Sequence, residues 1–120
     1  IKNLLENKKI HFNDPFSKRC YCYISDFTDA LIKMILNMKN FQIHNCANIN
    51  EEFNAFGLSK ILKKEFFDLN ISFSFNEIVK KNKYKIIRAR PDISSLKKVG
   101  WKPKVSVDIG FRNTYNFYKY

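Results

Sequence analysis

Glycine is the residue type that most constrains what this chain can fold into. Only three glycines occur in the 120 residues, at Gly57, Gly100 and Gly110, and they lie far apart. A loop that binds dinucleotide phosphates needs closely spaced glycines, because its backbone must turn tightly and approach the phosphate groups. The sequence contains no such loop. This argues against a self-contained enzyme of the usual nucleotide-cofactor classes.

Length and apolar content predict one folded domain. A mass of 14.3 kDa suits a single core. The chain is 45% hydrophobic and 16% aromatic, which excludes a disordered polyelectrolyte. We therefore expect residues 1–120 to form a single unit.

The positive charge of the chain is carried mostly by lysine. The 22 basic and 11 acidic residues give a net charge of +11, and only four of the basic residues are arginines, Arg19, Arg88, Arg90 and Arg112. Abundant Lys, Ile, Asn and Phe are typical of an AT-rich genome, so part of this charge reflects mutational drift. Arginines retained against that drift are better candidates for a function. The surface still attracts phosphates and nucleic acid non-specifically.

Helix-like and strand-like patterns alternate along the chain. Apolar residues at helical spacing predict a strong helix that is capped by Ser25-Asp26 and carries an apolar side made of Phe27, Ala30, Leu31, Met34, Ile35 and Met38. Further helices are expected at 1–9, at 56–66, at 92–99, where Gly100 ends the helix in a left-handed conformation, and at 106–118, where Ser106 is the cap. Strands are expected at 11–14, 20–24, 41–47, 71–75 and 84–87. This pattern predicts an α/β fold with a small mixed sheet and about four helices.

Three cysteines, Cys20, Cys22 and Cys46, make an odd count without the density of a disulfide scaffold, which favours a reducing cytosol. No run of about 18 apolar residues could span a membrane, and we predict a cytoplasmic protein. The pairs Cys20-x-Cys22 and His44-x-Cys46 could supply four zinc ligands. Ordinary packing of small strand residues is the favoured interpretation, so no metal site is predicted.

Two side-chain pairs have spacings that suggest chemistry. Tyr115 and Lys119 lie one helical turn apart, as in a proton-transfer pair, but the pattern arises easily by chance in a chain rich in both residues, and no catalytic residue is predicted. Arg88 and Arg90 project to the same side of an extended segment and could grip a diphosphate. The alternative for this second pair is a surface salt bridge or a solvated charge.

Three stretches resemble one known family. Residues 18–30 (KRCYCYISDFTDA) are similar to an "R-D-aromatic-x-Y-V-x-D" segment, residues 42–47 (QIHNCA) to a "Y/F-N-hydrophobic-G" strand, and residues 90–114 to an "R-P-D-I-S … G-W-x-P-x-V … G-L-x-x-T" segment. Their order and distances resemble the C-terminal part of the extended short-chain dehydrogenase/reductases, the NAD-dependent nucleotide-sugar epimerases and dehydratases. Cys20 replaces the usual acidic residue, and Cys46-Ala47 replaces a glycine-containing turn.

The resemblance implies a substrate-binding lobe that lacks the Rossmann domain, fragment-like and without catalytic or cofactor motifs of its own. It implies that Arg19, Arg90 and, less directly, Arg88 contact the diphosphate of a nucleotide sugar. The intact parent enzyme would use NAD(P) and would act in polysaccharide biosynthesis. The partners implied are the nucleotide sugar and a missing N-terminal Rossmann domain, or a second copy bound through the exposed face.

Two other functions stay open from the sequence. One is a basic nucleic-acid-binding module, which no recognition motif supports and which we therefore do not favour. The other is a truncated remnant without activity.

Overall fold

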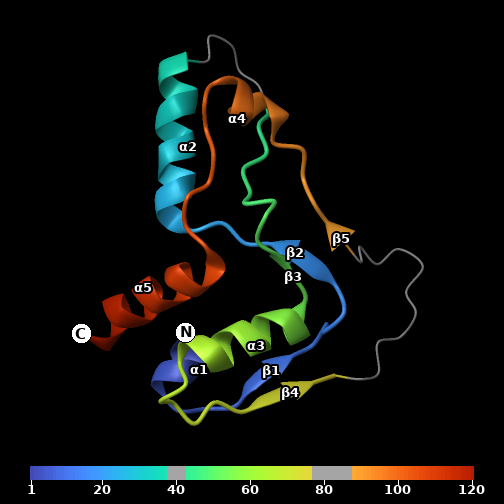
Figure 1. The fold of residues 1–120 in the computed structure, drawn as a ribbon, viewed down its shortest axis with the longest axis vertical. Helices are drawn as coiled ribbons and strands as arrows, with labels where there is room; N and C mark the ends of the chain where they lie inside the picture. Colours follow the sequence, from blue (N-terminus) through green and yellow to red (C-terminus); the bar gives the residue numbers. More distant parts are fainter. Residues whose placement is uncertain (38–42, 77–87) are drawn as a thin grey trace.

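The fold is described by a computed structural model, which covers residues 1–37, 43–76 and 88–120. Its helices are α1 (Lys2–Leu5), α2 (Ile24–Asn37), α3 (Ala55–Glu65), α4 (Ser94–Lys98) and α5 (Val107–Lys119). Its strands are β1 (Ile10–Phe12), β2 (Lys18–Cys20), β3 (Glu52–Phe53), β4 (Phe73–Phe75) and β5 (Arg88–Ala89) (Figure 1). The predicted α/β class is confirmed, with five helices and two small sheets in these residues.

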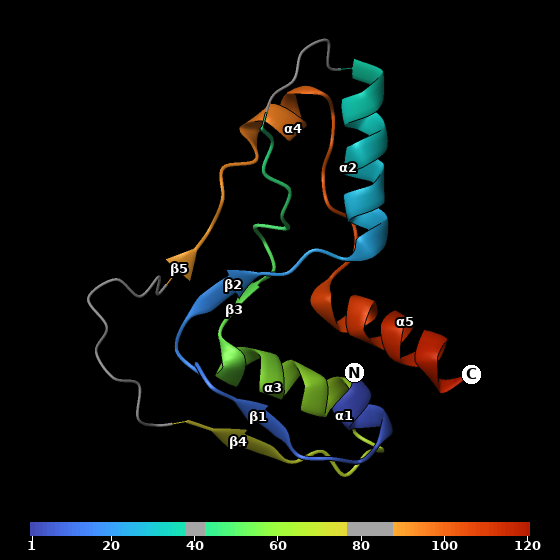
Figure 2. The same ribbon diagram turned by 180° about the vertical axis from the view of Figure 1, so that it is seen from behind.

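The strands pair with partners that are distant in the sequence. β1 and β4 form a parallel two-stranded sheet, and β2 is the centre of a three-stranded sheet in the order β3-β2-β5. β2 runs antiparallel to β3 and parallel to β5 (Figure 2). The second sheet is therefore mixed, as the sequence predicted.

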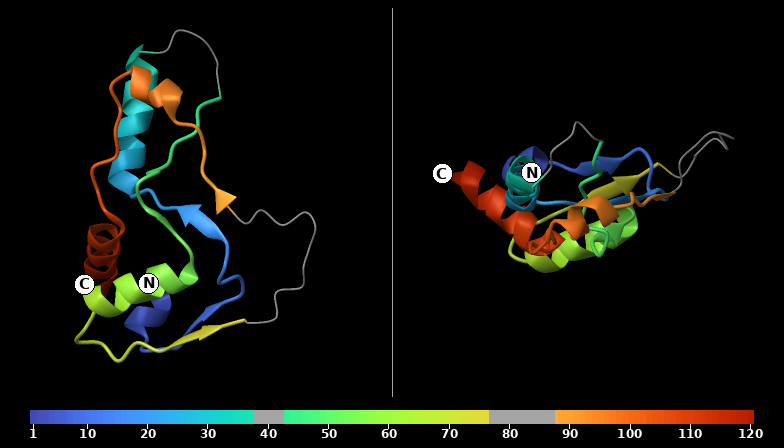
Figure 3. Two further views of the ribbon diagram at one scale, coloured as in Figure 1. Left: turned by 45° about the vertical axis from the view of Figure 1, so that its right-hand side comes forward. Right: turned by 90° about the horizontal axis from the view of Figure 1, so that it is seen from above.

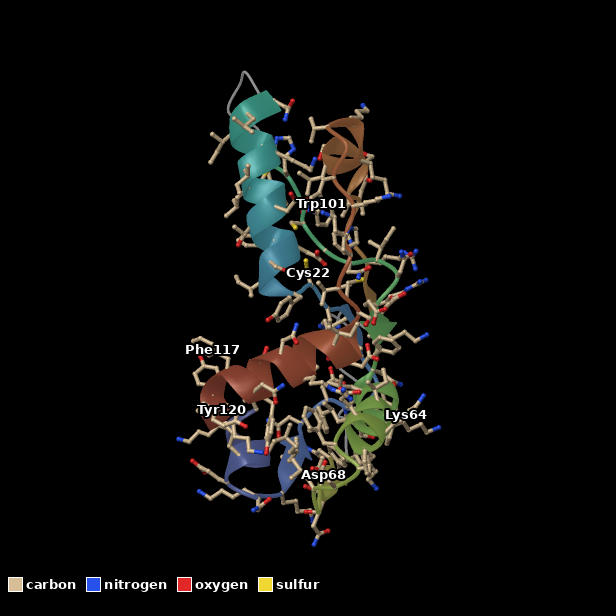
Figure 4. All side chains as sticks on the ribbon, turned by 60° about the vertical axis from the view of Figure 1, so that its left-hand side comes forward. Cys22, Lys64, Asp68, Trp101, Phe117 and Tyr120 are labelled. Carbon is tan, nitrogen blue, oxygen red and sulfur yellow. The ribbon has the colours of Figure 1, made fainter. Side chains whose placement is uncertain are left out.

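Two hydrophobic clusters lie above and below this mixed sheet in the view of Figure 1, and we call them the upper and the lower cluster. The lower cluster joins α1, α3 and α5 through Leu4, Leu58, Leu62, Phe66 and Val107. The upper cluster joins α2 and α4 to the neighbouring irregular segments through Ala30, Ala47, Ile93, Leu96 and Trp101. Figure 4 shows Trp101 between α2 and the α4 segment, and it is only 1% exposed.

The molecule is flat. Its principal extents are 48 × 43 × 19 Å, and its radius of gyration is 16.6 Å, against about 14 Å for a compact chain of this length. Seen from above, the helices lie beside the strands and do not cover both sheet faces (Figure 3). A fold of this shape leaves element faces open that a compact domain would bury.

Helix α3 forms where the sequence predicts it. Asn54 is its N-cap, and the side-chain oxygen of Asn54 accepts a hydrogen bond from the Gly57 N–H at 2.9 Å. Leu58 and Leu62 are buried on one face, while Lys63 and Lys64 lie in the last turn, where their charge suits the helix dipole.

Gly100 ends α4 in the predicted left-handed conformation, with φ at +74°. Its N–H donates to the Lys97 carbonyl, and the Trp101 N–H donates to the Leu96 carbonyl, both at 3.0 Å. This is a Schellman motif, which satisfies the last carbonyls of a helix. It also turns the chain so that Trp101 enters the upper cluster.

The predicted start of α2 is wrong by about two residues. The helix begins at Ile24, and the preceding strand is β2 at 18–20 instead of 20–24. Asp26, predicted as part of the cap, instead makes long-range contacts. Its Oδ2 accepts the backbone N–H groups of Lys104 and Val105, at 3.0 and 2.9 Å, and its carbonyl accepts Trp101 Nε1 at 2.9 Å.

The predicted strand at 41–47 is also wrong where it can be checked. Residues 41 and 42 lie outside the described residues, and residues 43–47 form no strand. Instead, Asn45 Nδ2 donates to the Asp92 carbonyl at 3.2 Å, which ties this segment to the start of α4. Cys46 and Ala47 pack against the upper cluster. The expected strand at 84–87 and Met38 of the predicted helix also lie outside the described residues.

The apolar side of α2 is buried only in part, because Ala30 lies in the upper cluster and Met34 packs against it, while other apolar residues are exposed. Among its residues only Asp26 and Ala30 are buried. The exposed apolar residues of this helix are Ile24, Phe27, Leu31, Ile32, Ile35 and Leu36. We call these six residues the α2 apolar face. A helix usually buries such a face, so it marks a surface that the described fold leaves open.

Candidate functional site

The three arginines that the sequence singles out lie on the mixed sheet. Arg19 is in the central strand β2, Arg88 is in β5, and Arg90 directly follows β5. Lys18 pairs with Arg88 across the two strands, and Arg19 pairs with Ala89. The sheet therefore brings all three predicted residues into one region.

They do not, however, share one face. Side chains alternate along a strand, and residues paired across strands point to the same side. Lys18 and Arg88 thus lie on one face, together with Cys20 and its partner Glu52. Arg19 lies on the other face.

Glu52 joins Arg88 and Arg90 on the first of these faces. Arg88 donates Nε and Nη2 to the two carboxylate oxygens of Glu52, at 2.6 and 2.7 Å. Arg90 donates Nη1 to Glu52 Oε2 at 3.3 Å. We call these three residues the Arg88–Glu52–Arg90 cluster. Arg88 makes the salt bridge that the sequence left open as an alternative.

The charges of the cluster shift the pKa of neighbouring groups. Hydrogen bonds from Arg88, with smaller contributions from Arg90, lower the pKa of Glu52 to about 2. Burial raises the pKa of the Cys20 thiol, and the Glu52 charge adds to this, while the two arginines oppose it. The carboxylate is therefore ionised across the physiological range, and the thiol is protonated.

Glu52 is the site residue that sequence reasoning missed. Its only signal was the pair Glu51-Glu52, two adjacent carboxylates in a chain of net charge +11. Glu51, the other member of this pair, caps the start of α5, because its Oε2 accepts the Val107 N–H at 2.9 Å. Ser106, which the sequence predicted as this cap, makes no capping hydrogen bond with its side chain.

Arg19 lies two residues before Tyr21, which lines an apolar pocket. Arg19 Nη1 donates to the Lys18 carbonyl at 2.8 Å. Burial raises the pKa of Tyr21, two residues further on, and the charge of Arg19 opposes that shift. Tyr21, Tyr23 and Phe111 help to line a pocket of about 230 Å³ between the β2–α2 connection and α5. The charge of Arg19 thus acts on one aromatic residue of the pocket, Tyr21.

The glycines do not form a dinucleotide site. The Gly57 N–H donates to Asn54, the Gly100 N–H to Lys97, and the Gly110 N–H to Ser106. A phosphate-binding turn presents free backbone N–H groups to its ligand, and none of the three glycines offers one. Within residues 1–37, 43–76 and 88–120, these glycines therefore do not fit the pyrophosphate of NAD.

The cysteines do not form a metal site. No group of three or more His, Cys, Asp or Glu side chains within residues 1–37, 43–76 and 88–120 is placed to hold a metal ion. All three cysteines are free. Burial and the neighbouring Cys46 raise the pKa of Cys22 to about 12, so its thiol is a weak nucleophile.

Two further sequence observations can be placed. Tyr115 and Lys119 share a face of α5, with Lys119 Nζ 5.8 Å from the centre of the Tyr115 ring. Tyr115 also packs on Phe66 at a ring distance of 5.0 Å, as part of the lower cluster. Within the part of the chain that the structure describes, no helix is long and apolar enough to cross a membrane.

Comparison with known proteins agrees with the motifs. No protein-family model matches the sequence. Over 121 aligned residues the chain is 30% identical to the bifunctional polymyxin resistance protein ArnA of Wigglesworthia glossinidia brevipalpis, an alignment that covers 88% of this chain. The UDP-glucuronic acid 4-epimerase of Bacillus cereus, solved with UDP-glucuronic acid and NAD, matches 98% of the chain with a TM-score of 0.77 and 23% identity.

A second enzyme shares the fold. The dTDP-glucose 4,6-dehydratase of Bacillus anthracis, solved with NAD, matches 98% of the chain with a TM-score of 0.74 and 17% identity. The resemblance to the C-terminal part of the extended short-chain dehydrogenase/reductases is confirmed. The chain spans only 18% of the length of ArnA and 36–37% of the two solved enzymes.

Proposed function

We propose that this chain is a nucleotide-sugar-binding lobe of an NAD-dependent sugar epimerase or dehydratase. The observation that carries the proposal is its fold, shared along 98% of its length with enzymes solved with UDP-glucuronic acid and NAD or with NAD. On this proposal the chain does not turn over substrate by itself. It binds the nucleotide and diphosphate end of the substrate, and NAD is held by another part of the enzyme.

The arginines of the mixed sheet support an anion-binding role. Arg88 and Arg90 share the carboxylate of Glu52 and both have exposed side chains, and guanidinium groups bind phosphates through paired N–H donors. Arg19 lies on the opposite face. We propose Arg90 and then Arg88 as diphosphate ligands on one face of the sheet, and Arg19 as a diphosphate ligand that approaches from the other face.

The α2 apolar face supports a partner surface. Ile35 and Leu36 are 79% and 75% exposed, and contiguous apolar surface of this kind marks an interaction site. We propose that this face receives the dinucleotide-binding domain of the enzyme. In the isolated chain a second copy could occupy the same face, which would appear as self-association.

Calorimetric titration of the protein with UDP, CDP and dTDP tests the proposal. We expect one of these nucleotides to bind, and Arg90→Ala and Arg19→Ala to weaken its binding. Arg112→Ala is the matched control, because Arg112 pairs with Glu65 on α3, away from the mixed sheet. The proposal is rejected if no nucleotide binds to the folded protein. DNA binding with a steep salt dependence and no competition by free nucleotides would favour a nucleic-acid-binding module instead.

A further inference from the structure

Glu52 stands out because, among the described residues, it is the carboxylate that accepts hydrogen bonds from both Arg88 and Arg90. Its side chain is 9% exposed, whereas those of Arg88 and Arg90 are 57% and 43% exposed. Glu52 is thus the inner member of the Arg88–Glu52–Arg90 cluster, and the two guanidinium groups form its outer surface. A carboxylate in this position can either block the arginines or hold them in place.

The hydrogen bonds indicate that Glu52 does not block them. A guanidinium carries five N–H groups on more than one edge of a planar fork. Glu52 accepts Nε and Nη2 of Arg88 and only Nη1 of Arg90. Each arginine therefore keeps further N–H groups that no described residue accepts. Because both side chains are exposed to about half their area, these groups are open to a ligand.

The same contacts fix where the two cations point. Two guanidinium groups on one side of a short strand repel each other, and each has a long side chain with many rotamers. A carboxylate hydrogen-bonded to both removes much of that freedom and offsets the repulsion. Lys18 pairs with Arg88 across β2 and β5, so a third cation lies on this face.

We propose that Glu52 is a positioning residue, which holds Arg88 and Arg90 as a fixed pair that binds the phosphate groups of the ligand. The proposal rests on the proposed function for the nature of that ligand. Glu52 carries the same charge as the phosphate ligand. Removing a negative charge ordinarily strengthens the binding of an anion, but we expect the removal of the Glu52 charge to weaken it.

The test is calorimetric titration of the folded protein with inorganic pyrophosphate and, separately, with UDP. Glu52→Gln should weaken pyrophosphate binding roughly tenfold, because two side chains must then be ordered by the ligand itself. Glu52→Asp keeps the charge on a shorter side chain and should bind with intermediate affinity. Glu65→Gln is the matched control, because it breaks the Glu65–Arg112 ion pair outside the mixed sheet, and it should change nothing.

A second readout needs no ligand. In the NMR spectrum of the wild-type protein, the Arg88 Nε–H signal should be resolved and slow to exchange with water, because this group donates to Glu52. In Glu52→Gln it should move toward the signals of solvated arginines. Circular dichroism establishes that each variant is folded before its affinity is compared.

The outcomes separate this inference from the proposed function. Equal or tighter pyrophosphate binding by Glu52→Gln overturns the positioning role, and so does a wild-type protein that binds no pyrophosphate. If pyrophosphate binds and responds to Glu52→Gln but UDP does not bind, the nucleotide proposal fails and the positioning role stands. If UDP binds equally well to the wild-type protein and to Glu52→Gln, the nucleotide proposal stands and the positioning role fails.

Discussion

Asp26 tests how α2 is joined to the segment between α4 and α5. It lies in the first turn of α2, is 3% exposed, and accepts the N–H groups of Lys104 and Val105 with one oxygen. Asp26→Ala removes both hydrogen bonds and leaves two partly buried donors without their acceptor. Each bond to a charged acceptor contributes about 1.5–3 kcal/mol, and because water can reach part of this site, we expect a total loss of roughly 2–4 kcal/mol.

That loss is a large share of the roughly 5–15 kcal/mol that stabilises a typical domain. Urea unfolding measures it, and for a chain of this size the midpoint should fall by about 2 M. Trp101 is the only tryptophan and lies in the upper cluster, so its fluorescence reports the affected region. Far-UV circular dichroism follows the whole chain in the same samples.

Asp29→Ala is the matched control, one turn further along α2. Its Oδ2 is buried without a hydrogen-bond partner among the described residues, so its removal should leave the free energy of unfolding unchanged or raise it. Equal midpoints for the two variants would refute the account of Asp26 as the link between α2 and the segment that precedes α5.

Three further predictions concern other parts of the fold. Gly100→Ala should destabilise the protein by about 1–2 kcal/mol in urea unfolding, because φ is positive there, whereas Gly57→Ala inside α3 should be neutral or stabilising; the opposite order would contradict the Schellman motif. The pKa of Glu52 is lowered from 4.5 to about 2, so its ion pairs stabilise the fold above pH 4.5 and cease to do so as the pH falls toward 2; the difference in unfolding midpoint between wild type and Glu52→Gln should shrink over that window, and a constant difference would refute this. Replacing Ile35 and Leu36 together by Lys should reduce self-association in light scattering without shifting the unfolding midpoint, because both side chains are already exposed; an unchanged mass distribution for an associating wild-type protein would exclude α2 as the contact.

Local sequence patterns predicted a helix and its packing correctly where another part of the same chain covers the apolar face of that helix. The apolar spacing around Leu58 and Leu62 predicted α3 correctly, because α1 and α5 cover that face within the same cluster. Gly100 was predicted correctly because a left-handed residue after a short helix is a local requirement. The same periodicity predicted the α2 helix but not its exposure. A repeat of apolar residues shows that a helix has an apolar face, and says nothing about whether its partner belongs to the same chain.

The candidate site could be predicted only in part. The spacing of Arg88 and Arg90 gave their common side, and the structure brings them together. Their partner Glu52 could not be found, because its position follows from the register of β3 and β5 on β2, which local sequence does not encode. The opposite orientation of Arg19 follows from that register too.

The strand pairing also determines when the fold can form. The consecutive strands β2 and β3 pair antiparallel, but α2 lies between them in the sequence. In the parallel pair of β1 and β4, His11 contacts Ser74, 63 residues later. The parallel pair of β2 and β5 joins residues still further apart, such as Arg19 and Ala89. Pairing segments this far apart requires large loops to close first, which slows folding. On the ribosome, β1 and β2 emerge well before either parallel partner, so their backbone edges stay open to other chains during synthesis. The arginine pair on the mixed sheet is thus among the last features of the molecule to be assembled.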